Sequence, residues 1–569
     1  NISAIATSDG ITVDTDGPAL EAPFEGSLTA DIDYQNSATE LIISWSGSDS
    51  ASVIALYEYA LGVTPGGAQI VPWTSAGTAT ADTLVFSSYQ PLIEGVTYFL
   101  SVRATDVAGN MSSVSLGDGI YIDFTDPVAG SAIDGLSTDI SYTGSDSTLT
   151  VSWSGFNDTH SGIASYQAAI EDGAGNSVVD WTDVGNVDTW TAIGLSLSNA
   201  TTYHVLIRAA DGAGNLSTSV STNGITVDTD GPVVGYVLDG DAGDMDWANV
   251  DSILTFSWYD FSDTLSGLSY YEYAVGTTTP GGTETISWTS ASRLYSTVTV
   301  NDLVLDNTTT YYVSVRAVDS VANVSSTATS DGFTLDIDVP TIFYVNEGSI
   351  ATDLDIQNVD SALSASWLGI DISPGSGIDF YEIALGTAAG DSNIIDWYNT
   401  VQTYTIDTLI NADSLTLVDG FTYYVSVRVT DFAGNRSAVL SGDGILIDLT
   451  PPLTGTVHDG PGADIQFTPS TTTLSANWSG FRDTVSSIVK YELALGDTTA
   501  DNIVAWDSVG MSTAITIDTL ALTNATTYYF TIRATDLAGN VSPIVPSNGI
   551  TIDIDPPISG TVADGLDGD

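Results

Sequence analysis

Short runs in which apolar and polar residues alternate cover the whole chain. In the run that begins at Tyr98, the residues Tyr98, Leu100, Val102 and Ala104 fall on one face, and Arg103 falls on the other. A period of two indicates β-strands, and turns rich in Gly, Asp, Asn and Ser separate the runs. No stretch has the spacing of an amphipathic helix. The pattern therefore predicts an all-β protein built from short strands.

The alternating pattern recurs five times along the chain. A tryptophan that closes a β-branched run returns at intervals of 105 to 111 residues, and a second tryptophan and an arginine recur with it. A period of this length matches a seven-stranded sandwich of about 100 residues. The first tryptophans are Trp45, Trp153, Trp258, Trp367 and Trp478; the second are Trp73, Trp181, Trp288, Trp397 and Trp506; the arginines are Arg103, Arg208, Arg316, Arg428 and Arg533.

Each repeat also carries a set of sequence motifs in a fixed order. They read L-x-V-S-W, then G-I-x-x-Y-E-x-A-L-G, then T-x-Y-x-V-x-V-R-A-x-D-x-A-G-N-x-S. These motifs resemble the fibronectin type III and related immunoglobulin-like repeats of large bacterial surface proteins and adhesins. The resemblance implies a linear tandem array of seven-stranded β-sandwiches with the strand order A-B-C-C′-E-F-G. Stalks, adhesins and enzyme spacers all use this fold, so the fold alone does not decide the function.

We expect five complete repeats and two partial ones. The start of the chain matches the end of a repeat, and its last residues match the start of one. We therefore interpret the chain as a window of a longer array. The expected boundaries are 1–16 for the last strand of a preceding repeat, 17–125, 126–230, 231–338, 339–450 and 451–555 for repeats 1 to 5, and 556–569 for the first strand of a following repeat.

The composition narrows the classes of partner. The 569 residues contain 72 acidic and only 9 basic side chains, for a formal net charge of −63. Nucleic acids and acidic membrane surfaces are poor partners for so negative a chain because like charges repel, so we expect no nucleic-acid partner, and cations are the natural partners. The absence of cysteine excludes disulfides and thiolate metal sites, and no apolar run reaches transmembrane length.

Four acidic features recur in register, and the strand order implied by the resemblance places them at the pole where two repeats meet. They are the D-x-D of the linker, an aspartate shortly after the first tryptophan, the Asp and Asn of D-x-A-G-N, and the [DE]-G turn after strand A of the preceding repeat. The expected sets are Asp14, Asp16, Asp49, Asp106 and Asn110; Glu25, Asp123, Asp126, Asp158, Asp211 and Asn215; Asp134, Asp228, Asp230, Asp263, Asp319 and Asn323; Asp239, Asp336, Asp338, Asp371, Asp431 and Asn435; Glu347, Asp448, Asp483, Asp536 and Asn540; and Asp459, Asp553 and Asp555 at the end of repeat 5.

Carboxylates cannot crowd together unpaired, because each raises the pKa of the next. Calcium fits such a set, since it takes six to eight oxygen ligands with flexible geometry, whereas zinc prefers His or Cys and magnesium keeps its waters. We therefore predict Ca²⁺ at the junctions, where it would stiffen the array. The linker of repeat 5 reads D-L-T-P-P, and its missing second aspartate predicts weaker binding there. The alternative is that these residues are turn formers.

Other recurring residues favour structural roles. Each repeated arginine is expected to pair across strands with Glu58, Glu272, Glu382 or Glu492, while Arg208 faces Gln167 and lacks that partner. The first tryptophan of each repeat is predicted to be core, and the second leaves a carbohydrate platform open as an alternative. The tyrosines in the tyrosine-corner position are expected to pack: Tyr98, Tyr203, Tyr311, Tyr423 and Tyr528.

The repeats contain no recurring set of residues of the kind that enzymes use for catalysis. His160, His204 and His458 stand at three unrelated positions, and no G-x-S-x-G, H-E-x-x-H or Walker sequence is present. We therefore do not expect an enzyme. Asn-x-Ser follows every D-x-A-G loop, and Asn199, Asn307 and Asn524 begin Asn-x-Thr sequons. These asparagines are candidate glycan sites in a secreted protein, with a plain polar turn as the alternative.

Together these features predict an extracellular or cell-surface structural protein. It would be a segment of a fibre, stalk or adhesin shaft whose β-sandwiches are rigidified by calcium between them. Expected partners are calcium ions and further copies of the array, including assembly into a filament. The alternatives are carbohydrate- or surface-binding adhesin modules, and the spacer region of a large secreted enzyme.

Overall fold

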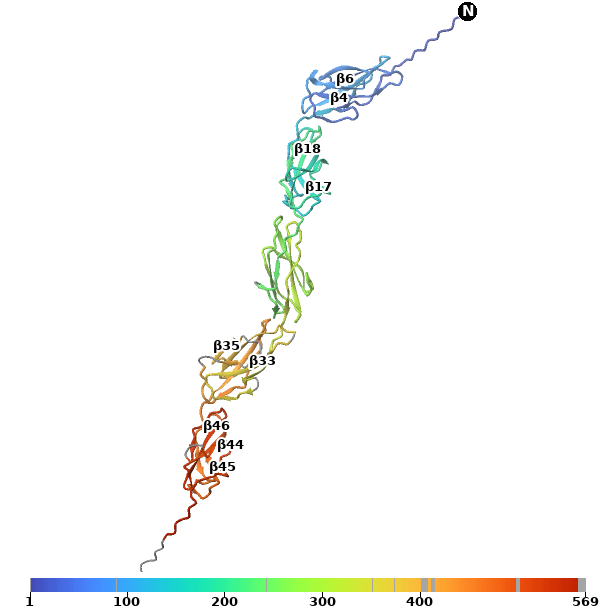
Figure 1. Ribbon diagram of the computed structural model, residues 1–569. Coiled ribbons are helices and arrows are strands. Elements are labelled where there is room, and N and C mark those ends of the chain that lie inside the picture. The colour runs from blue at the N-terminus through green and yellow to red at the C-terminus, as the bar shows by residue number, and fades with distance from the viewer. Residues whose placement is uncertain are drawn as a thin grey trace, which may run out of the picture.

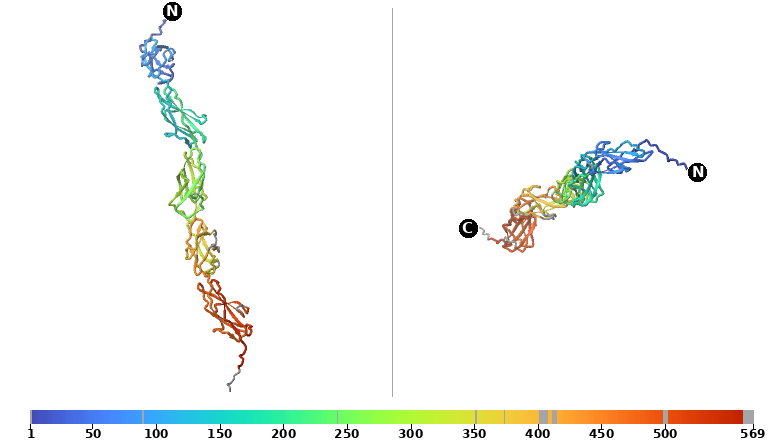
Figure 2. Two further views of the ribbon diagram at one scale, coloured as in Figure 1. Left: turned by 90° about the vertical axis from the view of Figure 1, so that its left-hand side faces the viewer. Right: turned by 90° about the horizontal axis from the view of Figure 1, so that it is seen from above.

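The alternating runs form strands, and the strands of each repeat close into a sandwich of two sheets. The computed structural model describes residues 2–88, 90–241, 243–349, 352–372, 374–400, 408–410, 415–497 and 502–560. Five sandwiches follow one another in a row from the N-terminal to the C-terminal end (Figure 1), and a second viewing direction shows the same extended row (Figure 2). The predicted all-β fold is confirmed, since the helical structure described is one short 3₁₀ turn, η1 (Phe86–Ser88).

The larger sheet of each repeat has the strand order A′-G-F-C-C′, with the first part of G also pairing F. Strand A′ runs parallel to G, whereas the other neighbours are antiparallel. In this order the strands are β3 (Tyr34–Gln35), β10 (Ser115–Leu116) with β11 (Ile120–Ile122), β9 (Thr97–Asp106), β6 (Ile54–Gly62) and β7 (Val71–Gly77); β13 (Tyr142–Thr143), β19 (Val220–Ser221) with β20 (Ile225–Val227), β18 (Thr202–Asp211), β15 (Ile163–Asp172) and β16 (Ser177–Gly185); β22 (Trp247–Ala248), β28 (Ala328–Thr329) with β29 (Phe333–Leu335), β27 (Thr310–Asp319), β24 (Leu268–Gly276) and β25 (Ile286–Ser292); β32 (Ile356–Gln357), β38 (Leu440–Ser441) with β39 (Ile445–Ile447), β37 (Thr422–Asp431), β34 (Ile378–Gly386) and β35 (Ile395–Thr400); and β41 (Phe467–Thr468), β47 (Val545–Pro546) with β48 (Ile550–Ile552), β46 (Thr527–Asp536), β43 (Ile488–Gly496) and β44 (Val504–Gly510).

The smaller sheet has the order A-B-E, so that the two sheets enclose the core. Repeat 1 adds a short pair of β1 (Ala19–Leu20) with β5 (Gly47–Ser48), and repeat 4 adds β31 (Thr352–Asp353). In chain order the three strands are β2 (Phe24–Glu25), β4 (Glu40–Ser44) and β8 (Ala81–Val85); β12 (Ser131–Asp134), β14 (Thr148–Ser154) and β17 (Thr189–Ile193); β21 (Tyr236–Leu238), β23 (Leu254–Tyr259) and β26 (Thr297–Val300); β30 (Thr341–Ser349), β33 (Leu363–Ile370) and β36 (Thr408–Ile410); and β40 (Thr456–Asp459), β42 (Leu474–Ser479) and β45 (Ala514–Ile517).

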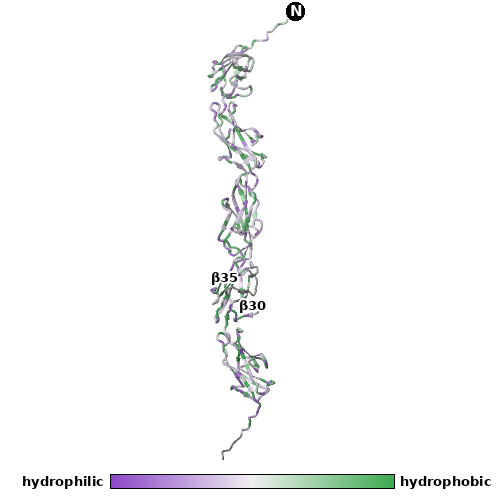
Figure 3. Cartoon of the chain, turned by 60° about the vertical axis from the view of Figure 1, so that its left-hand side comes forward, coloured by the Kyte–Doolittle hydropathy of each residue, from purple (hydrophilic) through white to green (hydrophobic). Residues whose placement is uncertain are grey.

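Each repeat has its own hydrophobic core. The first tryptophan of every repeat lies in it, from fully buried Trp367 to Trp45 at 5% exposure, so the core prediction is confirmed. Along β9, the predicted inward residues Tyr98, Leu100 and Val102 are at most 1% exposed. Hydrophobic and hydrophilic residues are interleaved along every sandwich (Figure 3), as a period of two requires.

The predicted tyrosine corner is present in all five repeats. The backbone N–H of Ile93 donates to the Tyr98 hydroxyl at 2.9 Å, five residues upstream of the tyrosine. The same bond closes the other corners at 2.7–3.0 Å. The ring packs in the core while its hydroxyl satisfies a loop N–H, which the expectation of packing alone did not include.

The two expected partial repeats do not form strands among the described residues. Residues 2–18 and 553–560 have no regular secondary structure. A strand needs a neighbour that takes up its backbone hydrogen bonds, and among the described residues no ladder of such bonds reaches beyond the bond from the Asp553 N–H to the Thr468 carbonyl. The rest of the expected C-terminal strand, 561–569, lies outside the described residues. No helix in the described part of the chain is long and apolar enough to cross a bilayer.

Candidate metal centre

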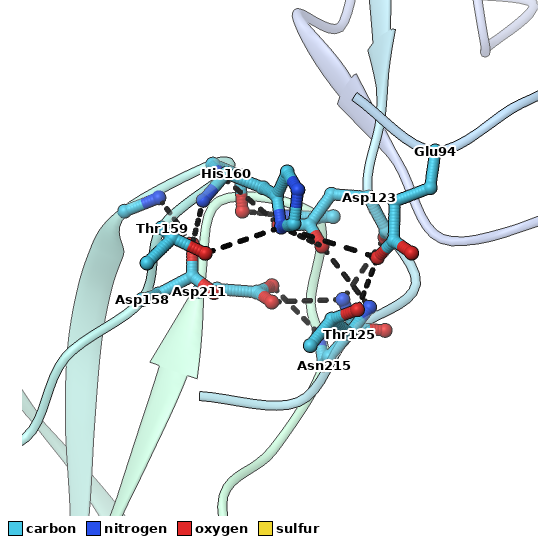
Figure 4. Close-up of polar contacts among 11 residues, drawn as sticks. Glu94, Asp123, Thr125, Asp158, Thr159, His160, Asp211 and Asn215 are labelled. Carbon is cyan, nitrogen blue, oxygen red and sulfur yellow. Dashed lines mark hydrogen bonds and ion pairs between the residues drawn. The ribbon is translucent and has the colours of Figure 1, made fainter. Parts of the chain in front are cut away.

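Three aspartates from three separate segments meet at the start of every repeat. In repeat 2, Asp123 of the linker, Asp158 of the B–C loop and Asp211 of the F–G loop each place one carboxylate oxygen within 4.8 Å of the other two (Figure 4). We call this set the joint cluster. The others are Asp14, Asp49 and Asp106; Asp228, Asp263 and Asp319; Asp336, Asp371 and Asp431; and Asp448, Asp483 and Asp536.

The linker aspartate belongs to both repeats at once. The backbone N–H of Asp123 donates to Gln35 O of repeat 1 at 2.9 Å. Its carboxylate accepts a bond from the Ser161 N–H of repeat 2 at 2.9 Å, and its carbonyl accepts one from Asn215. Asp123 is fully buried between the two repeats, and so are its counterparts. The counterparts are Asp228, Asp336 and Asp448. The linker is therefore held by contacts with both of the repeats that it joins.

The asparagine of the D-x-A-G-N loop positions the joint cluster. Asn215 Nδ2 donates to Asp211 Oδ2 at 2.8 Å and to the carbonyl of Asp123 at 3.0 Å. The amide thus ties the F–G loop to the linker. The predicted ligand asparagines all make this pair of bonds, which gives them a positioning role: Asn110, Asn215, Asn323, Asn435 and Asn540.

A second copy of the F–G loop sequence of repeat 2 lies away from any joint, so the two loops can be compared. The same sequence, D-G-A-G-N, closes the C–C′ hairpin of repeat 2, where Asp172 accepts bonds from Asn176 as Asp211 does from Asn215. Bonds from Asn176 lower the pKa of Asp172. At the joint of repeat 2, burial and the nearby carboxylates of Asp123 and Asp158 raise the pKa of Asp211, whereas at the start of repeat 1 burial is outweighed by the bonds from Asn110, which lower the pKa of Asp106. The D-G-A-G-N sequence therefore forms the same turn with or without a joint, as the turn-former alternative predicts. The turn does not explain why three aspartates meet at the joint.

The carboxylates of each joint cluster lie close together, with little opposite charge around them in the described part of the chain. Burial raises the pKa of Asp371, Asp431 and Asp448, and neighbouring joint-cluster carboxylates add to each shift. Apart from His160 beside Asp123, no basic side chain among the described residues pairs with a joint-cluster aspartate. Several oxygens are buried without a hydrogen-bond partner: Asp14 Oδ2, Asp228 Oδ1, Asp371 Oδ1, Asp448 Oδ2 and Asp483 Oδ2.

The spacing of these oxygens suits a single calcium ion. Two oxygens bound to one ion at about 2.3–2.6 Å cannot be more than roughly 5 Å apart. The joint-cluster oxygens of repeats 1, 2 and 3 lie within 4.8 Å of one another. With three carboxylates and no His or Cys in the set, the arrangement favours a hard cation.

The second linker aspartates lie outside the joint clusters. Asp230 accepts a bond from Asn199 Nδ2 on the E–F loop of the preceding repeat, and Asn199 Oδ1 accepts the Thr229 N–H. Asp338 pairs with Asn307, and Asp555 with Asn524, in the same way. The second aspartate therefore clamps the linker to the preceding repeat, because its side chain points back along the array. At the chain ends, Asp16 N–H bonds Asp14 and Asp555 N–H bonds Asp553.

Two joints use a reversed version of this clamp. In repeat 1, Thr125 bonds Glu94; at the end of repeat 4, Thr450 bonds Asp419. The prediction for Asp126 was wrong in register, since Thr125 stands where Asp230 does and Asp126 is exposed. The aspartate missing from D-L-T-P-P is one of these clamp residues, and the joint cluster Asp448, Asp483 and Asp536 is complete. Weaker calcium binding at that joint stays a prediction, but the missing aspartate is not one of the joint-cluster residues.

The acids of the [DE]-G turns were wrongly placed at the joints. Glu25 groups with Asp31 and Asp118 of its own repeat, and its Oε1 accepts the Leu100 N–H at 3.0 Å. The physical reason is strand register: Glu25 lies opposite Ile43 within the A–B pair, so its side chain enters the sandwich. The other four are likewise fully buried inside their repeats: Asp134, Asp239, Glu347 and Asp459.

The joint between repeats 1 and 2 also contains a histidine that the sequence did not assign. His160 Nδ1 lies 3.9 Å from Asp123 Oδ1 and 4.0 Å from Glu94 Oε1 (Figure 4). Its ring packs near Tyr121. Glu94 belongs to the E–F loop of repeat 1, so the imidazole links that loop to repeat 2. No recurring pattern could have revealed it, because the other repeats have no histidine there.

The predicted cross-strand Arg–Glu pairs are present. Arg103 bonds Glu58 at 2.8 Å, and the equivalent pairs form in repeats 3, 4 and 5. Arg208 has no carboxylate partner, as predicted, but donates to Gln167 Oε1 at 2.8 Å. Each guanidinium also lies 4.2–4.5 Å from the ring centre of the second tryptophan. One face of that ring is therefore covered, which weakens the case for a carbohydrate platform.

The Asn-x-Ser sequences have internal partners. The asparagine amide is engaged at the joint, and the serine hydroxyl accepts a strand F backbone N–H at 2.9 Å, as Ser217 does from Ala209. The Asn-x-Thr asparagines hold the linker clamp instead. These contacts account for the recurrence through turn structure, and glycosylation stays a prediction.

The sequence was compared with known protein families and with curated proteins. No model of a known protein family matches the chain. Exoglucanase B and endoglucanase B of Cellulomonas fimi are each 28% identical to it, over 305 and 295 residues. These matches cover 52% and 51% of this chain, but only 24% and 25% of those proteins. The chain thus matches about a quarter of the length of these curated relatives.

Three solved structures are similar at low identity. They are the FN1–FN3 domains of chicken CNTN1 (18% identity, 56% of this chain, 99% of that one, TM-score 0.24), a tetra-tandem repeat from the extending region of a large adhesion protein (16%, 75%, 100%, 0.27) and titin domains A168–A170 (14%, 56%, 99%, 0.26). The five two-sheet sandwiches with their tyrosine corners identify this chain as a tandem array of fibronectin-III-like or immunoglobulin-like repeats.

Proposed function

We propose that this protein is an extracellular structural shaft whose joints are stiffened by calcium. The observation that carries the proposal is the joint cluster, in which carboxylates from a linker and two loops of the following repeat converge while the linker backbone stays paired to the preceding repeat. Length comes from the sandwiches and stiffness from the joints.

Calcium is the cation this donor set suits best. Three carboxylates offer up to six oxygens, and water can complete a coordination number of six to eight. The ion would neutralise two of the three charges at each joint. It would bind only the arrangement in which both loops and the linker are in place, so it would favour one joint geometry over the many that a free linker would allow.

A paired substitution separates joint binding from turn structure. Asp211→Asn should remove one ligand from the joint cluster of repeat 2, and it also replaces one of the two oxygens that accept bonds from Asn215. Asp172→Asn makes the same change in the same loop sequence away from any joint. Calorimetric titration of the full chain should lose one calcium ion with Asp211→Asn and none with Asp172→Asn. Equal behaviour of the two variants would contradict a joint site.

Calcium should also change the stability of the joints in the wild-type chain. We expect a higher thermal melting temperature with saturating calcium than with a chelator, because an ion that binds only the folded joint stabilises it by about 2.7 kcal/mol at a hundredfold excess over its Kd. Identical melting curves in the two conditions would contradict the proposal.

A second candidate function is the spacer of a large secreted enzyme. It is supported by the 28% identity to two glucanases over about half of this chain. Calcium at the joints would then set the distance between a catalytic domain and its neighbours. Sequencing the complete gene distinguishes the candidates, since the spacer requires a catalytic domain on the same polypeptide. Sedimentation of the purified chain with calcium would test association of copies into a filament.

A further inference from the structure

Every repeat contains a second acidic cluster, away from the joint. Its base is the acid that ends strand A, and this side chain is fully buried in all five repeats. We call the set the inner cluster. Its base residues are Glu25, Asp134, Asp239, Glu347 and Asp459.

The surrounding residues form a seat for this carboxylate, and they change together with it. Where the acid is Glu, a glycine faces it: a Cβ on Gly117 would lie 1.9 Å from Glu25 Oε1, and one on Gly442 would lie 2.1 Å from Glu347 Oε2. Glu25 then bonds the strand F backbone at Leu100 directly. Glu347 makes the same bond to Val425 at 3.0 Å.

Where the acid is Asp, a hydroxyl residue replaces the glycine. Ser330 Oγ accepts the Val313 N–H at 2.9 Å and bonds to Asp239 in turn. Thr222 and Ser547 do the same beside Asp134 and Asp459. Either Glu facing glycine or Asp facing a hydroxyl residue thus holds a carboxylate at this position. A buried carboxylate is therefore a feature of all five repeats.

One oxygen of the buried carboxylate accepts no hydrogen bond in repeats 1, 2, 3 and 5, whereas both oxygens of Glu347 in repeat 4 accept backbone N–H groups. Glu25 Oε2 and Asp239 Oδ1 are buried and accept no hydrogen bond. In repeat 1, Asp31 and Asp118 bring their oxygens within 4.8 Å of the Glu25 carboxylate, and both are exposed at the rim. The charges of Asp244 and Asp331 act on Asp239, and Asp443 acts on Asp353 in repeat 4.

Repeats 2 and 5 differ at the rim in a consistent way. An asparagine replaces the third acid, and Asn223 Nδ2 donates to Asp139 at 2.7 Å while Asn548 donates to Asp464 at 2.8 Å. In repeat 5 a histidine lies nearby, with His458 Nδ1 3.9 Å from Asp464 Oδ1. The rim asparagine supplies a hydrogen-bond donor in these two repeats, whereas repeats 1, 3 and 4 have three carboxylates.

We propose that the inner clusters of repeats 1, 3 and 4 each bind a hard divalent cation of the calcium class. The buried carboxylate at the base and the two rim aspartates are its ligands. The rim asparagine replaces this cation in repeats 2 and 5. The sites lie within single repeats, so they are independent of the joint clusters and of the function proposed for them.

The full chain contains the matched controls for this proposal. Asp118→Asn, Asp331→Asn and Asp443→Asn together convert the three acidic rims to the form found in repeats 2 and 5. Equilibrium dialysis with metal analysis should show three fewer bound calcium ions per chain than in the wild type. Terbium luminescence, which uses a calcium mimic, should fall in the same proportion. An unchanged ion count would overturn the proposal.

Replacing the rim asparagines of repeats 2 and 5 by aspartate is the reverse change, and it tests the proposal even if the first variant folds poorly. Asn223→Asp and Asn548→Asp should add two bound ions per chain, and a variant that gains none would overturn the proposal. Asp211→Asn, which removes a joint ligand, should leave the three inner-cluster ions in place. Loss of joint binding with retention of the inner sites, or the reverse, therefore separates failure of the two proposals.

Discussion

Repeats 1 and 2 differ in several paired polar contacts, but they share the three aspartates of the joint cluster and the asparagine that positions them. Repeat 1 has Glu25 with Gly117 where repeat 2 has Asp134 with Thr222. Other pairs change together in the same way. The linker clamp is Glu94 with Thr125 in one and Asn199 with Asp230 in the other, and the arginine partner is Glu58 or Gln167.

The difference teaches which features are interchangeable. A backbone N–H, a linker clamp and a guanidinium can each be satisfied by more than one pair of side chains, provided that donors and acceptors match. The three carboxylates of the joint cluster are Asp in all five repeats. The F–G loop aspartate needs both of its oxygens as acceptors for the loop asparagine, so hydrogen bonding explains its charge. Several linker and B–C loop aspartates have an oxygen without a hydrogen-bond partner, and their uniform charge favours an ionic role.

The largest effect is expected from exchanging one seat of the inner cluster for the other. Glu25→Asp alone leaves the buried Leu100 N–H without its acceptor, at a cost of about 1–3 kcal/mol. Gly117→Ser alone drives a Cβ into the Glu25 carboxylate, at a similar cost. The double variant recreates the pair Asp239 and Ser330, and should recover most of the lost stability. Hydrogen exchange of repeat 1 peptides within the full chain measures each variant.

Additive losses in that double variant would contradict the interpretation. They would mean that Glu25 and Gly117 are not coupled, and that the seat does not depend on matching the acid to its neighbour.

A smaller effect is expected from exchanging the linker clamp. Thr125→Asp in repeat 1 places a carboxylate beside Glu94, close to Asp123, and should lower stability by about 1 kcal/mol. Adding Glu94→Asn creates the pair found as Asn199 and Asp230, and should restore it. Thermal melting of both variants checks the order. A double variant as unstable as the single one would show that the two clamps are not equivalent.

The smallest effect is expected at the arginine. Glu58→Gln gives repeat 1 the contacts of repeat 2, in which Arg208 keeps an amide partner and its tryptophan. The loss should be about 0.2–1 kcal/mol, because the pair is partly exposed. Melting at low and high salt should show that the difference shrinks as salt increases. A salt-independent loss would point to packing instead of charge.

The fold and most of the joint could be predicted from the sequence. Alternation from Tyr98 to Ala104 reveals which face is buried, and loops at one pole must bring Asp158 near Asp211. The first inference needs only a period of two, whereas the second also needs the strand order that the family resemblance implies.

The inner cluster and the linker clamp could not be predicted in the same way. Glu25 contacts Leu100, 75 residues later, and the depth of a turn in the sandwich depends on strand register. The clamp at Thr125 was missed because Thr125 and Asp126 are adjacent in the sequence, and only the backbone pairing shows which of them stands where Asp230 does. The stacking of each arginine on the second tryptophan depends on strand C′, whose pairing with strand C contains register shifts.

The central claim is that calcium fixes the geometry between neighbouring repeats, and a distance across one joint tests it most directly. The chain has no cysteine, so Thr182→Cys and Ser290→Cys, both exposed, place spin labels only on repeats 2 and 3. With calcium, pulsed electron-spin measurements should give a narrow distance distribution; with a chelator, a broad one. A control pair within repeat 2, Thr182→Cys and Thr191→Cys, should not change. A distribution across the joint that is equally narrow, or equally broad, in both conditions would contradict the claim.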